Sequence, residues 1–166
     1  MNPVIETLVK ELNRVMFGNP WYGSSIKNIL DSVFYADAFK YANNYTHSIA
    51  ELALHILAWN EETLSRFEGN EPKEPAIGDW PWVKFKDEMY WNEIKEKIYI
   101  THGKLIEIVK EFPLEKFEVV IGIENNRELA TGYTYRESLL GLMQHNIYHA
   151  GQISLQNVAL TKKNLS

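Results

Sequence analysis

The sequence predicts an all-α protein, a four-helix bundle with up-down-down-up topology and a long crossover between its second and third helices. Apolar residues recur at helical spacing in four segments of ~20 residues, each about 30 Å long as a helix. Capping residues, glycines and prolines stand at the ends of these segments. The connector over residues 70–83 could extend about 46 Å, enough to return along the whole bundle.

The first helix is expected to begin at Asn2, a residue type that caps helices, with Pro3 in the first helical position. Gly18 and Pro20 end it. A shorter helical piece is expected over residues 25–34. It leads toward the second long helix.

The second long helix is expected to begin between Thr46 and Ser48, where Ser48 and Glu51 have the spacing of a capping box. It continues to about Phe67. The three prolines and one glycine that follow exclude helix until about residue 84. The third helix is expected from about Phe85 to Glu111.

Two segments after the third helix, residues 117–123 and 128–135, are rich in β-branched and aromatic residues and flank two asparagines. This pattern indicates a small hairpin before the fourth helix. The fourth helix is expected to begin at Thr134, with Glu137 as its capping partner, and to extend to about Leu160.

Composition limits the classes of protein. The chain has 166 residues, 45% hydrophobic and 23% charged, which predicts one globular domain over residues 1–166. The sequence has no run of ~18 apolar residues that would predict a membrane span, and its first ten residues do not resemble a secretory signal. A soluble cytoplasmic protein is therefore expected. A net charge of −5 argues against nucleic acid as a partner, and zero cysteines exclude thiolate metal sites and a cysteine nucleophile.

Residues 138–161, SLLGLMQHNIYHAGQISLQNVALT, contain no charged side chain, so this helix is expected to be buried on most sides. His145, His149, Gln152 and Gln156 nevertheless fall on one stripe of it. Buried polar groups need partners. The stripe therefore indicates an internal polar site, a hydrogen-bonded network in the core, or a solvent-facing stripe without charge. Spacing alone leaves these interpretations open.

His145 and His149 are four residues apart, so their imidazoles can converge on one cation. His55 on the second helix is a candidate third ligand, although a histidine among apolar residues is more often a hydrogen-bonded core residue. His47 lies about 12 Å before His55 along the helix axis, too far to share a metal with it, and is expected at the helix start. His102 has charged neighbours and is expected at or near the surface.

Several chemistries lack their motifs. The chain has no HExxH, no Glu-x-x-His pair of a di-iron bundle, no GxSxG, no GxGxxG and no phosphate loop. A heme between His55 and a histidine of the fourth helix would have no attachment motif.

The motifs LALHILAW (residues 52–59) and LMQHNIYHAGQI (residues 142–153) resemble the DinB/YfiT-like superfamily of metal-binding four-helix bundles. The resemblance implies that His55, His145 and His149 bind a divalent metal ion, zinc or nickel, and that the protein forms a homodimer. It also implies the up-down-down-up bundle that the connector length independently predicts.

Three neutral imidazoles would leave the metal with open positions, where a water or a thiol could be activated. Gln152 is predicted to hydrogen-bond to the His149 imidazole without binding the metal itself. Glu51 is predicted to orient His55, to act as a general base, or only to cap its helix. Trp59 and Tyr148 are expected as core walls.

Three functions follow from the resemblance. The first is a metal-dependent enzyme: a thiol S-transferase acting on a small-molecule thiol and an electrophile, or else a hydrolase. The second is a non-catalytic, stress-related metal-binding module. The third, a DNA-damage protein acting on nucleic acid, rests only on the family's name and conflicts with the acidic charge.

Overall fold

The computed structural model describes residues 2–42, 45–122 and 124–163, and it confirms the predicted all-α class. The long helices are α1 (Pro3–Met16), α4 (Ile49–Phe67), α5 (Glu88–Glu111) and α6 (Tyr135–Lys163). Shorter helices lie in the connections: α2 (Ile26–Asp31), α3 (Tyr35–Ala38) and the 3-10 helix η1 (Leu114–Glu118). No helix in these described ranges is long and apolar enough to cross a membrane.

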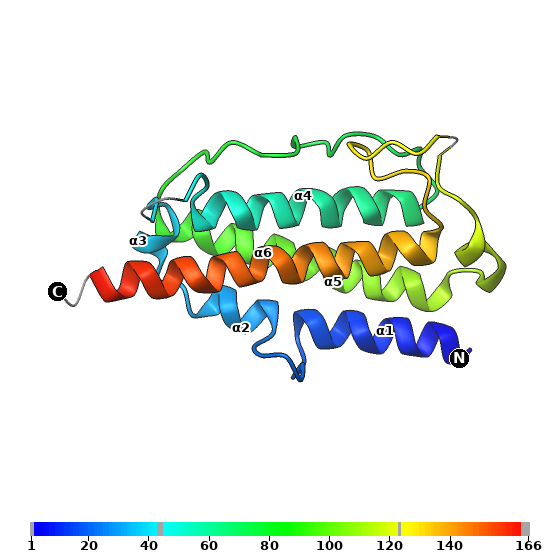
Figure 1. Ribbon diagram of the computed structural model, residues 1–166, viewed down its shortest axis with the longest axis horizontal. Coiled ribbons are helices and arrows are strands. Elements are labelled where there is room, and N and C mark those ends of the chain that lie inside the picture. Colours follow the sequence, from blue (N-terminus) through cyan, green and yellow to red (C-terminus); the bar gives the residue numbers. More distant parts are fainter. Residues whose placement is uncertain (1, 43–44, 123, 164–166) are drawn as a thin grey trace.

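The long helices lie alongside one another (Figure 1). In this view α4 and α5 both run from left to right, whereas α1 and α6 both run from right to left. The connector between α4 and α5, drawn in green along the top, returns over the length of α4. This return places a proline-rich segment beside the middle of the bundle, where the candidate site lies.

Local capping chemistry sets the helix starts. Asn2 accepts a hydrogen bond from the backbone of the first turn of α1 at 2.9 Å. Ser48 and Glu51 form the predicted capping box, with Ser48 N to Glu51 Oε2 at 2.7 Å and Glu51 N to Ser48 Oγ at 3.3 Å. Thr134 and Glu137 make the same pair of bonds, at 2.8 and 3.1 Å, before α6.

Two boundaries of the long helices differ from the prediction, and the shorter helix α2 ends at Asp31 rather than near Phe34. α5 begins at Glu88 rather than near Phe85, because the side chain of Asp87 caps it by accepting a hydrogen bond from Tyr90 N at 2.8 Å. α6 continues past Leu160 to Lys163. In both places the apolar pattern located the helix and missed its end by about one turn.

The predicted hairpin is reduced to one antiparallel bridge between Val120 and Thr134, and the described residues contain no strand. Gly122 and Gly132 have φ values of +74° and +83°, which take the chain out of the extended region beside the bridge. Beyond the bridge, Gly132 N donates to Ile121 O at 2.9 Å, and no regular strand forms in the described residues. Ile123, part of the predicted hairpin, lies outside the described residues.

The helix buried on most sides is α4, not α6 as expected. Fourteen of the 19 residues of α4 are buried. α6 exposes Tyr148 to 64%, and three further apolar side chains of this helix are also exposed, Leu140, Leu155 and Val158. The expectation failed because α6 carries apolar and small residues on its outer side, where charged residues are usual. Tyr148 is accordingly not a core wall.

Candidate metal centre

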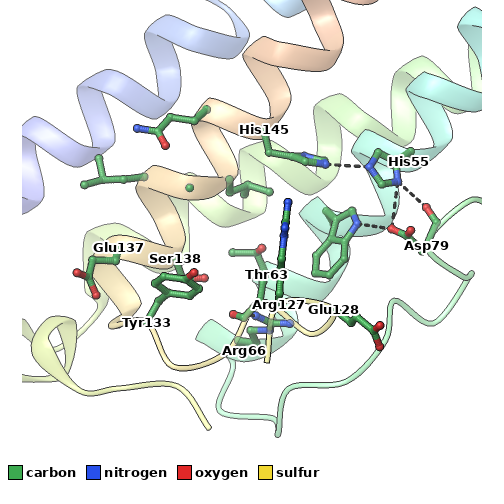
Figure 2. A pocket seen from close by; sticks show the side chains of 16 residues that line it. His55, Thr63, Arg66, Asp79, Arg127, Glu128, Tyr133, Glu137, Ser138 and His145 are labelled. Atoms are coloured by element: carbon green, nitrogen blue, oxygen red, sulfur yellow. Dashed lines mark hydrogen bonds and ion pairs between the residues drawn. The ribbon is translucent and has the colours of Figure 1, made fainter. Parts of the chain in front are cut away.

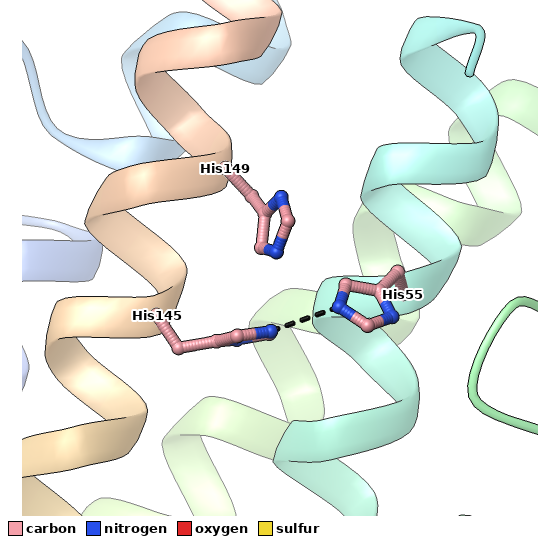
Figure 3. A group of neighbouring side chains, drawn as sticks. All are labelled: His55, His145 and His149. Atoms are coloured by element: carbon pink, nitrogen blue, oxygen red, sulfur yellow. Dashed lines mark hydrogen bonds between the residues drawn. The ribbon is translucent and has the colours of Figure 1, made fainter. Parts of the chain in front are cut away.

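Three histidine side chains meet between α4 and α6 (Figure 3). His55 comes from the middle of α4, and His145 and His149 come from successive turns of α6. The Nε2 atoms of His55 and His145 are 2.9 Å apart, and one ring nitrogen of each histidine lies within 4.8 Å of the other two. His55 and His149 are buried, and His145 is partly buried. The structure thus brings together the three predicted ligands.

Each of the three imidazoles has a hydrogen-bond acceptor next to its Nδ1 atom. His55 Nδ1 is 2.6 Å from the backbone oxygen of Asp79, and His149 Nδ1 is 2.7 Å from Gln152 Oε1. His145 Nδ1 is 3.3 Å from Asn146 Oδ1. A neutral imidazole carries one proton, and these acceptors place it on Nδ1. Each Nε2 therefore presents a lone pair.

Two Nε2 lone pairs 2.9 Å apart repel each other unless a proton or a cation lies between them. A proton is disfavoured, because burial lowers the pKa of His145 to about 4, helped by the nearby His149 and His55. Burial also lowers the pKa of His149, although the hydrogen bond to Gln152 acts in the opposite direction.

The donor set fits a divalent metal. Tetrahedral zinc with bonds of 2.0–2.1 Å holds two ligand nitrogens about 3.3 Å apart, close to the separation of the His55 and His145 nitrogens. Imidazole nitrogens are the ligands that zinc and nickel accept readily. Three neutral imidazoles leave the charge of the ion uncompensated, so the open side of the site would attract an anionic ligand.

A chain of buried amides continues behind His145. Asn146 accepts from the ring and donates through Nδ2 to Asn60 Oδ1 at 3.1 Å. Asn60 in turn donates to the backbone oxygen of Ile56 at 2.8 Å. Because each group in this hydrogen-bonded series donates to the next, the two amides keep the proton of His145 on Nδ1. Neither asparagine was predicted, although a lone asparagine in an apolar helix is itself an indication of a buried amide.

His102 is fully buried, whereas a residue at the surface or partly buried was expected. Its Nε2 is 3.0 Å from the backbone oxygen of Leu12, and its Nδ1 faces Asn60 Oδ1 at 3.4 Å. The prediction failed because its charged sequence neighbours occupy other faces of α5, whereas His102 shares the inner face with Ile98 and Leu105. Burial lowers its pKa to about 4, against the effect of the Leu12 carbonyl. His102 is not part of the imidazole cluster.

The connector closes one side of the site. Asp79 Oδ1 accepts a hydrogen bond from Trp59 Nε1 at 2.8 Å and lies 3.3 Å from His55 Nδ1. The indole of Trp80 is stacked between two imidazoles, 3.7 Å from the ring centre of His47 and 4.1 Å from that of His55. His47 lies at the start of α4, as expected, and Trp80 separates it from the cluster. Asp79 and Trp80 were not predicted, because nothing in the sequence of the connector indicates where it docks.

Glu51 and Gln152 were the predicted supporting residues. Gln152 Oε1 faces His149, and its Nε2 donates to Tyr148 Oη at 3.3 Å, which orients the amide. Glu51 occupies the capping box and accepts a hydrogen bond from Tyr41 Oη at 2.8 Å. Burial raises the pKa of Glu51, but the bonds from Ser48 and Tyr41 outweigh this and lower it. These contacts place Glu51 as a helix cap.

A cleft of about 950 Å³ opens beside the cluster, with His55 and His145 at one end (Figure 2). Trp59, Tyr133 and Leu142 are among its apolar walls. The cleft therefore borders two of the three imidazoles, those of His55 and His145.

Comparison with known proteins agrees with this geometry. The model of the DinB superfamily matches residues 30–153, a range that contains all three histidines. The chain therefore belongs to the DinB superfamily. Neither a curated protein nor a solved structure matches the chain.

Proposed function

We propose that the protein binds one zinc or nickel ion through His55, His145 and His149 and transfers a small-molecule thiol to an electrophile. The observation that supports this most is the convergence of three Nε2 lone pairs whose opposite nitrogens are all held by acceptors. Such a preorganised, neutral donor set is typical of a divalent metal site with open coordination.

The metal, when bound, would act as a Lewis acid and lower the pKa of a coordinated thiol toward neutral pH. The residues of the chain orient the imidazoles that would bind the metal. Asp79, Asn146 and Gln152 keep the Nδ1 protons in place, so the three Nε2 atoms stay available as donors.

The cleft positions the second reactant. Trp59 and Leu142 provide apolar surface next to His145, which removes water from the carbon body of an electrophile. In the transfer a carbon–sulfur bond forms, the leaving group departs with the electrons of its bond to carbon, and the thiol proton goes to solvent.

We also propose that the protein is a homodimer, as the family resemblance implies. The exposed side of α6, which includes Leu140, Tyr148, Leu155 and Val158, supports this, because it lies within a run of residues without charge. Light scattering should give twice the 19.3 kDa mass of the chain, and Leu155→Glu should give the monomer mass. A monomer mass for the unchanged protein would contradict this.

The activity is tested by incubating metal-loaded protein with a panel of small thiols and alkylating or aromatic electrophiles, and detecting conjugates by mass spectrometry. Conjugate formation should exceed the uncatalysed rate, and the His145→Ala variant should lose it. A protein that binds metal stoichiometrically yet conjugates no thiol would instead be a non-catalytic metal-binding module.

A further inference from the structure

The cleft beside the imidazole cluster contains two arginines with different surroundings. Arg66 is 1% exposed, and its Nε donates to the carboxylate of Glu62 at 3.0 Å. Its other two nitrogens donate to the backbone oxygens of Ala130 and Leu129, at 3.1 and 2.7 Å. The charge of Arg66 is thereby neutralised, and its role is to anchor the loop that follows Arg127.

The loop is fixed from its other side as well. Asn126 Oδ1 accepts hydrogen bonds from the backbone nitrogens of Glu128 and Leu129, at 2.9 and 3.2 Å. Thr131 Oγ1 donates to the backbone oxygen of Glu124 at 2.7 Å. Arg127 therefore projects from an anchored turn whose backbone position does not depend on its own side chain.

The guanidinium of Arg127 has no hydrogen bond or ion pair with any residue in the described part of the chain, although Arg127 lines the cleft. Its side chain extends toward the end of the cleft at which His145 lies, and Glu128 points away from it (Figure 2). The other cleft carboxylates have different partners: Asp79 accepts from Trp59, and Glu137 caps α6. An unpaired guanidinium thus faces the same space as the Nε2 donors.

We infer that the cleft beside the imidazole cluster binds a thiol that carries a carboxylate, and that Arg127 binds this carboxylate. The inference rests on the proposed thiol chemistry. A guanidinium recognises a carboxylate through two parallel N–H bonds, which makes it selective for a planar anion. The apolar walls at Trp59 and Leu142 suit the carbon atoms between sulfur and carboxylate. Arg127 is then the residue that distinguishes anionic from neutral thiols.

The test compares three thiols of similar size, 3-mercaptopropionate, 2-mercaptoethanol and cysteamine, on the cobalt(II)-loaded protein. Binding is followed through the near-ultraviolet absorption that appears when a thiolate sulfur binds cobalt. We expect 3-mercaptopropionate to bind about tenfold more tightly than 2-mercaptoethanol, the effect of one charge-assisted hydrogen-bonded pair. Arg127→Gln should remove this preference.

Arg136→Gln is the matched control, because it changes the net charge equally at an arginine that pairs with Glu118 outside the cleft. This variant should keep the preference. Equal affinities in the unchanged protein, or a preference that survives in Arg127→Gln, would overturn the inference while leaving the thiol chemistry intact. If none of the thiols produces the absorption, the proposed function fails and the inference fails with it.

Discussion

The tautomer of His145 depends on two asparagines that no catalytic motif includes. An imidazole that presents Nε2 to a metal must carry its proton on Nδ1, and that proton needs an acceptor. Asn146 provides the acceptor, and Asn60 orients Asn146 by accepting from its amide nitrogen. The donor geometry of the site therefore extends to buried residues behind it.

Replacing Asn146 with leucine should weaken metal binding about 10- to 100-fold, because the His145 ring loses the acceptor that fixes its tautomer. Competition against a chromophoric chelator measures the change. Asn157→Leu is the matched control on the same helix, since Asn157 bonds to Ser32 away from the cluster. In metal-free protein, nitrogen NMR of His145 should show the Nδ1–H form only when Asn146 is present. Equal affinities for the two variants would refute this role.

His102, together with His145, should make the metal-free protein sensitive to acid. Burial lowers its pKa from the ordinary 6.5 to about 4 in the folded state, so between these values the unfolded chain binds a proton that the folded chain does not. The free energy of unfolding should therefore fall as pH decreases from 6.5 to 4, by up to about 1.4 kcal/mol per pH unit from this group. Urea unfolding in chelator gives the slope. His102→Gln should reduce it, and an unchanged slope would show that another group is responsible.

At the scale of elements, the connector between α4 and α5 contributes as much to the site as a helix does. Its Asp79 carbonyl fixes His55, and its Trp80 covers that imidazole. Prolines and Gly78 indicated only that this segment is not helical. Where an irregular segment docks depends on contacts with residues distant in sequence, so its contribution could not be predicted.

The stacking of Trp80 on His55 provides a built-in reporter of metal binding. Nickel bound at the cluster should quench tryptophan emission. Trp80→Phe should lose part of this quenching, because the Trp80 ring lies 4.1 Å from that of His55, whereas Trp59, 6.3 Å from the His145 ring, should still be quenched. Trp21→Phe is the control, since Trp21 is 93% exposed and lies on a loop outside the cleft. Quenching that is the same in both variants would place the metal elsewhere.

The helices themselves were the most predictable elements. Apolar spacing located them, and the capping boxes at Ser48 and Thr134 set two starts. The spacing of His145 and His149 also predicted their shared face correctly. The exposure of α6 was not predictable, because an apolar helix face can be buried by its own chain or left on the surface, and the sequence pattern is the same.

At the scale of the whole molecule, the fold class followed from periodicity, but the meeting of His55 with the α6 histidines did not. Taken alone, His55 looked like a core residue, and only the resemblance joined the two helices at one point. The cleft, its unpaired Arg127 and the amide chain arise from packing between segments far apart in sequence. A single sequence contains no direct record of such contacts.

The most direct test of the account is elemental analysis of the purified protein beside His55→Ala, His145→Ala and His149→Ala, with His47→Ala as the histidine control. We predict one zinc or nickel ion per chain in the unchanged protein and in His47→Ala, and strong loss of metal in each of the other three. Absence of metal from the unchanged protein after loading, or full retention in the three variants, would contradict the assignment of these imidazoles as ligands.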